Sequence, residues 1–167
     1  MKRSPIWMAM CLAASPLAIA DPIHPVPGGG YWHHDSGWVF PERIGDFVRV
    51  GIPQDVAGST DAVAHYACDR GGRRIVASVD VFAADSAAEF TTLESMTGGI
   101  ESPATLALDA EGTLLASRIV RERLPVYFVD TGPWRVRVQF TAPPDASLDV
   151  AMLDAFVRGQ RWDTLPR

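Results

Sequence analysis

A strict alternation of side chains between Trp134 and Thr141 constrains this chain more than any other feature of its sequence. Apolar residues occupy every second position, and Arg, Gln or Thr occupies the positions between them. Successive side chains of a β-strand point to opposite faces of a sheet, so this pattern predicts a half-buried strand. The run at 126–130 precedes it across the short turn 131–133, which predicts an antiparallel hairpin.

A second hairpin is predicted at residues 61–83. Apolar-rich runs at 61–68 and 74–83 flank Asp69-Arg70-Gly71-Gly72, a sequence typical of a tight turn. Residues 104–123 are compatible with a helix or a strand, and we favour a strand from Thr113 onward.

Two helices are predicted beside these strands. Ser86 and Glu89 form a capping box before a run of helical spacing that ends at Gly98-Gly99. A closing helix is predicted near the C-terminus, with Ser147 as its N-cap and Gly159 as its stop. Its buried face is expected to consist of Leu148, Ala151, Met152, Ala155 and Phe156.

The order of these elements is strands, helix, strands, helix. Tight hairpins join antiparallel strands, whereas parallel strands need longer crossovers. We therefore predict an α+β fold, in which an antiparallel sheet of about five strands has two helices packed on it.

The N-terminal region predicts export. Lys2 and Arg3 precede an apolar stretch, and Ala18-Ile19-Ala20 forms the A-x-A site typical of signal-peptide cleavage. Residues 1–20 are thus predicted to be a signal peptide that directs the chain to the periplasm or outside the cell. Residues 21–37, rich in Pro, Gly and His, are predicted to be a flexible leader, and residues 38–167 a single α+β domain.

Charge and composition exclude several classes of protein. The formal net charge is −5, and cleavage after Ala20 removes two positive charges, which gives −7. A nucleic-acid partner is not expected, because such proteins need a basic surface. The apolar stretch before Ala18 is shorter than the roughly 20 residues of a membrane span, so no transmembrane span is expected in the mature chain. Cys68 is then the only cysteine left, and no cofactor is indicated.

The mature region resembles a group of small exported proteobacterial proteins of unknown function. The residues that carry this resemblance are hydrophobic and turn positions: 38–41, 44–47, the hairpin at 61–83, 135–138, 142–143 and 153–156. The order of the elements also resembles the α/β/α sandwich of Mog1 and PsbP-like proteins. Neither resemblance implies an activity or supplies catalytic residues.

Arginine gives the candidate binding site. Arg135 and Arg137 are predicted on one face of the last strand, Arg118 in the region before it, and Asp80 on a strand of the same sheet. Cross-strand ion pairs on a solvated face would explain this set. A surface that recognises a small anionic ligand or an acidic partner would also explain it, because guanidinium groups bind carboxylates and phosphates in a bidentate manner.

Three histidines are weak metal-ligand candidates: His24, His33 and His34. Neighbouring side chains of an extended chain point apart, so His33 and His34 are not expected to share an ion. We therefore predict a solvated histidine leader and no built metal site.

No catalytic residues are assigned. His34, Asp35 and Ser36 are the residue types of a hydrolase triad, but adjacent residues cannot converge into that relay. His65 and Cys68 are three apart on a predicted strand and so face opposite sides of the sheet. Two classes of function remain: a non-catalytic binding module that uses its sheet face or its aromatic leader, and a hydrolase-type enzyme whose site the sequence does not identify.

Overall fold

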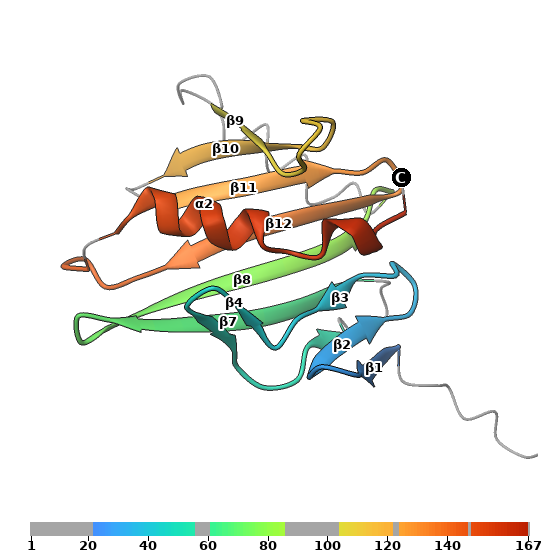
Figure 1. The fold of residues 1–167 in the computed structure, drawn as a ribbon, viewed down its shortest axis with the longest axis horizontal. Helices are drawn as coiled ribbons and strands as arrows, with labels where there is room; N and C mark the ends of the chain where they lie inside the picture. Colours follow the sequence, from blue (N-terminus) through green and yellow to red (C-terminus); the bar gives the residue numbers. More distant parts are fainter. Residues whose placement is uncertain (1–21, 56–60, 86–103, 122–123, 147, 167) are drawn as a thin grey trace, which may run out of the picture.

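A computed structural model of the chain describes residues 22–55, 61–85, 104–121, 124–146 and 148–166. Within them the strands form two sheets (Figure 1). The larger sheet has nine strands, in the order β4-β5-β7-β8-β12-β11-β10-β9, with β6 paired to β7. Its strands are β4 (Arg43–Ile44), β5 (Phe47–Arg49), β6 (Gln54–Asp55), β7 (Ala62–Arg70), β8 (Arg73–Ala83), β9 (Ala104–Ala107), β10 (Leu115–Arg121), β11 (Leu124–Asp130) and β12 (Trp134–Thr141).

Both predicted hairpins are confirmed. β7 and β8 pair antiparallel around Gly71 and Gly72, whose φ angles of 57° and 72° lie in the left-handed region that glycine tolerates. β11 and β12 pair antiparallel across 131–133. The strand expected after Thr113 is β10, which pairs with β11 and β9.

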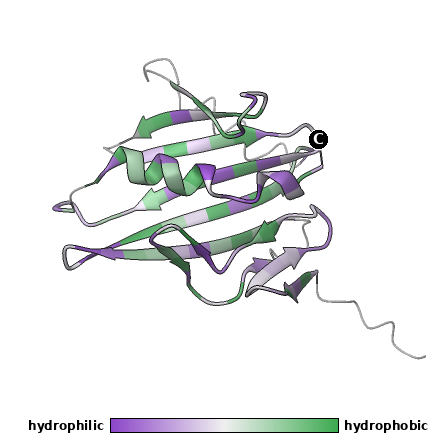
Figure 2. Cartoon of the chain, viewed as in Figure 1, coloured by the Kyte–Doolittle hydropathy of each residue, from purple (hydrophilic) through white to green (hydrophobic). Residues whose placement is uncertain are grey.

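Along β8 and β12, buried side chains alternate with more exposed ones, and the most polar residues of these strands lie on the more exposed side, as the bands along both strands show (Figure 2). We call the side on which α2 packs the helix face and the opposite side the polar face. The helix face carries buried residues from four neighbouring strands: Ala64, Tyr66, Ile75, Ala77, Val79, Val81, Tyr127, Val129, Val136 and Val138. These residues form the centre of the hydrophobic core.

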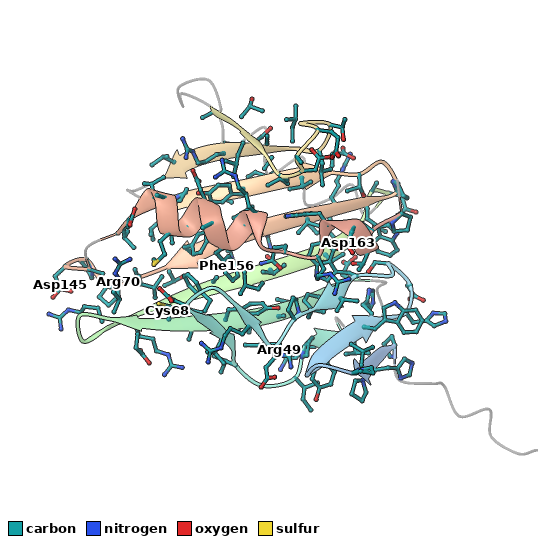
Figure 3. The ribbon with its side chains drawn as sticks, viewed as in Figure 1. Arg49, Cys68, Arg70, Asp145, Phe156 and Asp163 are labelled. Carbon is teal, nitrogen blue, oxygen red and sulfur yellow. The ribbon has the colours of Figure 1, made fainter. Side chains whose placement is uncertain are left out.

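Helix α2 (Val150–Arg158) lies across the helix face (Figure 1). Phe156 points from α2 to the sheet (Figure 3), and its ring lies 4.6 Å from that of Phe47 and 5.3 Å from that of Tyr66. The short helix η1 (Trp162–Thr164) follows. Trp162 packs edge-on against Trp38, with ring centroids 5.0 Å apart.

The predicted N-cap of this closing helix was wrong by two residues, and two of the five residues expected on its buried face are exposed. Asp149 is the N-cap, and its side chain accepts a hydrogen bond from the Ala151 amide. The residues that α2 buries are Leu153, Phe156 and Val157, whereas Ala151 and Ala155 are exposed. Ser147, the expected cap, lies outside the described residues.

The predicted fold class was also wrong. The described structure is mostly β, with 52% of it in strands and 10% helical, and its larger sheet exceeds the expected five strands. The short strands β4, β5, β6 and β9 lengthen the sheet at its edges. They carry two to four residues each, too few to give a clear alternation in the sequence. The helix expected from Ser86 lies outside the described residues.

Residues 22–37 differ from the flexible leader that we expected. The strands β1 (Ile23–Val26), β2 (Gly30–His33) and β3 (Val39–Phe40) form an antiparallel three-stranded sheet. Ile23, His33 and Phe40 are buried on its inner face. The domain therefore includes residues that we had placed before it.

Arg49 of β5 joins this N-terminal sheet to the larger one. Its Nη1 donates to the carbonyl oxygens of Phe40 (2.7 Å) and Pro41 (2.9 Å), and its Nη2 to that of Gly29 (2.8 Å). The guanidinium also lies over the Tyr31 ring, 4.6 Å from its centroid. One side chain of the larger sheet thus satisfies three backbone acceptors in or next to the N-terminal sheet.

Among the described residues, no helix is long and apolar enough to cross a membrane. The predicted signal peptide at 1–20 lies outside them.

Candidate functional site

The polar face brings three of the four predicted binding residues together. Arg137 and Asp80 are cross-strand partners in the register of β12 and β8, and Arg137 Nε donates to Asp80 Oδ2 at 2.9 Å. The side chain of Arg137 is 30% exposed and that of Asp80 is 16% exposed. This ion pair is therefore shielded from water more than an ordinary surface pair.

Arg135 lies two residues before Arg137 on the same face of β12. Its Nε is 3.5 Å from Asp130 Oδ2, and its side chain is 22% exposed. Its other cross-strand partner is Phe82, which is buried. Arg135, Arg137, Asp80 and Asp130 thus place two guanidinium groups and two carboxylate groups side by side on β8, β11 and β12.

Ser78 extends this cluster along β8. Its hydroxyl donates to Asp80 Oδ1 at 3.1 Å, so both oxygens of that carboxylate accept a hydrogen bond. His65 of β7 and Gln139 of β12 are the register partners of Ser78 on its two sides, and both are exposed. Neutral donors and acceptors therefore flank the charged groups.

Arg118 lies on the opposite side of the sheet. Its register partner is Tyr127, whose side chain belongs to the helix face. Arg118 Nη1 donates to Asp154 of α2 at 2.9 Å, and Tyr127 donates to the same carboxylate at 2.5 Å. Arg118 therefore holds α2 on the sheet and does not join the polar face.

The three candidate metal ligands do not converge. His33 is buried, and its Nδ1 is 2.8 Å from the Ser36 hydroxyl. His24 and His34 each contact the ring of Trp32, at centroid distances of 6.0 and 5.3 Å. The described residues contain no group of three or more His, Cys, Asp or Glu side chains placed to hold a metal ion.

The catalytic arrangements that the sequence argued against stay apart in the structure as well. His33 pairs with Ser36, whereas His34 Nδ1 pairs with Asp35 at 3.1 Å, so 34–36 make no relay. Cys68 is buried on the helix face and His65 is exposed on the polar face, which confirms their predicted separation.

The hydrogen bond of Ser78 bears on whether this serine could act as a nucleophile. A nucleophilic serine needs an adjacent base that can take its proton. Ser78 donates to Asp80 Oδ1, and Arg137 Nε donates to Asp80 Oδ2. The described hydrogen bonds therefore orient the Ser78 hydroxyl toward Asp80.

Sequence reasoning missed Ser78 and His65 as members of this cluster. Ser78 shares its strand face with Asp80, which the alternation along β8 already indicates. His65 needs the register of β7 with β8, and only the pairing across Gly71-Gly72 supplies it.

Comparison with family models, with curated proteins and with solved structures finds no match to this chain.

Proposed function

We propose that this chain is an exported, non-catalytic binding module whose polar face recognises a small ligand or a partner through an anionic group. The observation that carries the proposal is the placement of Arg135 and Arg137 on one sheet face, two residues apart and partly exposed. Guanidinium groups offer planar, bidentate hydrogen bonding to carboxylates and phosphates. Both arginines stand on a long strand of the sheet, which gives the recognition groups a rigid support.

Export is part of this proposal and is supported by the Lys2-Arg3, apolar and Ala18-Ile19-Ala20 pattern of the N-terminal region. Its test is the intact mass of the protein recovered from the periplasm of a bacterial host. We expect a chain that begins at Asp21. Recovery with Met1 retained would contradict the proposed signal peptide.

The binding test replaces Arg135 and Arg137 together with Gln. The probes are sulfate, phosphate, succinate and the dipeptide Gly-Gly, and the measurement is the melting temperature with and without each probe. We expect at least one probe to raise the melting temperature of the wild type and none to raise that of the double variant.

The matched control is Arg161→Gln, because Arg161 forms an exposed ion pair with Asp163 away from the polar face. It should keep the response of the wild type. Equal responses of the wild type and the double variant, or no response to any probe, would remove the proposal. A double variant that melts several degrees lower without ligand would make the arginines structural cross-strand partners.

A further inference from the structure

We propose further that the outer face of the N-terminal sheet binds a methylated ammonium group. The site consists of the side chains of His24, Trp32 and His34, which we call the aromatic platform. The starting observation is that both imidazoles contact the Trp32 indole, with ring centroids 6.0 Å away for His24 and 5.3 Å away for His34. The platform shares no residue with the polar face, so this inference goes beyond the function proposed above and does not depend on it.

Strand pairing places the three rings on one face of the sheet. His24 and Trp32 are register partners in β1 and β2. The amide of His34 donates to the Pro22 carbonyl at 2.8 Å, which continues this pairing one residue beyond β2. Because side chains alternate along a strand, His34 lies on the same face as Trp32, whereas the buried His33 between them points to the inner face.

The rings leave part of the indole in contact with water. The planes of His24 and His34 are tilted from that of the indole by 32° and 60°, so neither imidazole stacks flat on it. Trp32 is half-buried, and the side chain of His34 is 64% exposed. The platform is therefore a set of inclined aromatic rings at the surface.

Apolar side chains border the platform. Val39 of β3 is the register partner of Trp32. A Cβ atom on Gly30 would lie 3.0 Å from Val26 Cγ2 and 3.3 Å from Val39 Cγ1, so the two valines approach each other over this glycine. Their methyl groups lie on the same face as Trp32 and can pack against the methyl groups of a ligand.

The charge of this part of the chain favours a cation. Residues 22–40 contain no Lys or Arg, and Asp35 is their only acid. Asp35 Oδ1 is 3.1 Å from His34 Nδ1, and the Asp35 side chain is 43% exposed. Of the aromatic side chains, Trp attracts a cation most strongly to its ring face. A negative charge and an indole thus lie next to each other at the platform.

Two charged side chains of the following segment also approach the N-terminal sheet. Arg49 contacts the ring of Tyr31, which precedes Trp32 on β2 and therefore points to the opposite face. Its guanidinium also donates to four carbonyl oxygens, which hold it on that side. The Glu42 carboxylate lies beside Gly29 at the turn between β1 and β2, and adds a second negative charge.

A methylated ammonium group suits the platform better than a primary one. A primary ammonium group has three N–H donors that need acceptors. Asp35 supplies a carboxylate, but one of its oxygens already pairs with His34. A trimethylammonium group has no N–H donor, and aromatic side chains recognise it through the faces of their rings. Choline carries this group in its simplest soluble form.

The experiment compares choline with dimethylbutanol, its neutral isostere, in which carbon replaces the charged nitrogen. Each is titrated into the full protein at about pH 8, at which an imidazole is ordinarily neutral. Calorimetry gives the affinity, and the chemical shift of the Trp32 Nε1–H shows whether the ligand lies at the platform. The variants are Trp32→Phe and Asp35→Asn. Asp163→Asn is the matched control, since it removes an acid from an exposed pair elsewhere.

We expect choline to bind the wild type about tenfold more tightly than dimethylbutanol, which is the contribution of a partly desolvated cation–π contact. Asp35→Asn should weaken the binding of choline about threefold, because its carboxylate is partly exposed. Trp32→Phe should reduce the preference for choline about threefold, and Asp163→Asn should behave as the wild type does. The comparison of the two ligands needs no variant, so it holds even if Trp32→Phe folds poorly.

Phosphatidylcholine vesicles distinguish a free ligand from a lipid headgroup, because both carry the trimethylammonium group. We expect a free molecule, so the protein should bind choline and should not sediment with the vesicles. Sedimentation that choline inhibits would support the same site with a lipid as the source. Sedimentation that choline does not inhibit would overturn the proposal.

Other outcomes also reject this inference. Equal affinities for choline and dimethylbutanol would make the platform a simple apolar surface. A shift of the Trp32 signal by glucose but not by choline would make it a site for neutral sugars. No shift with any of these molecules would leave the three rings with a packing role only. The proposed function is tested separately, because the double variant of Arg135 and Arg137 should bind choline as the wild type does.

Discussion

Arg118 Nη1 lies 2.9 Å from Asp154 Oδ2 and joins β10 to α2 across 36 positions of the sequence. Asp154 also accepts a hydrogen bond from the Tyr127 hydroxyl. The side chains of Arg118 and Asp154 are only 26% and 15% exposed, so this network is shielded from water. It fixes the helix over the sheet at one point while Phe156 packs beneath it.

Replacing Asp154 with Asn should destabilise the fold. The change removes the negative charge and leaves the Arg118 guanidinium partly buried without its counterion, at a cost of about 1–3 kcal/mol. Urea denaturation would measure the loss in the free energy of unfolding. Asp163→Asn, in the exposed pair with Arg161, should cost less than about 1 kcal/mol, and an equal effect of the two variants would contradict this view.

The stability of the protein should fall in alkali because two tyrosines are buried. Burial raises the pKa of Tyr127 and of Tyr66 far above the usual value near 10, and the bond to Asp154 raises the pKa of Tyr127 further, whereas Arg49 opposes the rise at Tyr66. Because both folded-state pKa values exceed those of the unfolded chain, their contribution is complete below about pH 10 and is lost as the pH rises above it.

Urea denaturation between pH 8 and pH 11 tests this expectation. The wild type should lose stability above about pH 10, and Tyr127→Phe should lose less over the same interval because it removes one of the two titrating groups. A pH dependence that is identical in the wild type, Tyr127→Phe and Tyr66→Phe would show that these phenols are not responsible.

Cys68 should react slowly with thiol reagents in the folded protein. Its side chain is buried, burial raises the pKa of the thiol, and the negative charge of Asp46 raises it further. Since the thiolate is the reacting form, both effects slow the reaction. We expect labelling by a disulfide reagent to be far slower than in urea-unfolded protein, and equal rates would refute the burial of Cys68.

The central strands could be predicted because the alternation that identifies each strand lies within its own residues. β8 and β12 alternate apolar and polar residues over many positions, and Gly71-Gly72 marks the turn between β7 and β8. From these features the sequence correctly predicts which side of β12 enters the core. The grouping of Asp80 with Arg137 then follows from two strands that lie side by side.

The rest depended on contacts between distant parts of the chain. Residues 22–37 look like a linker by composition, yet Arg49 satisfies the Gly29 carbonyl and His33 is buried beside Trp134. The sequence of residues 22–37 contains no pattern that indicates the contact with Arg49 or the contact with Trp134. Arg118 was grouped with Arg135 because its strand was ambiguous, and only its register with Tyr127 places it on the helix face.

Arg49 should prove important for the attachment of the N-terminal sheet. Arg49→Met keeps much of the aliphatic stem but removes the hydrogen bonds to the carbonyls of Gly29, Phe40 and Pro41. We expect a loss of about 1–3 kcal/mol and faster amide exchange in β1 and β2 than in β8 and β12. Arg158→Met, which removes a single bond to the Ala107 carbonyl, is the control. Unchanged exchange in β1 and β2 would argue against this role.

Replacement of Gln160 should stabilise the protein, whereas the replacements of Asp154 and Arg49 should destabilise it. The side chain is buried, yet within the part of the chain that the structure describes neither its Oε1 nor its Nε2 has a hydrogen-bond partner. A buried amide in this state costs free energy that an apolar side chain of similar length avoids. Gln160→Met should therefore raise the free energy of unfolding by about 1 kcal/mol, whereas the same change at the exposed Gln139 should leave it nearly unchanged. A lower stability of Gln160→Met would mean that the carboxamide forms hydrogen bonds in the folded protein, and the unpartnered arrangement would be rejected.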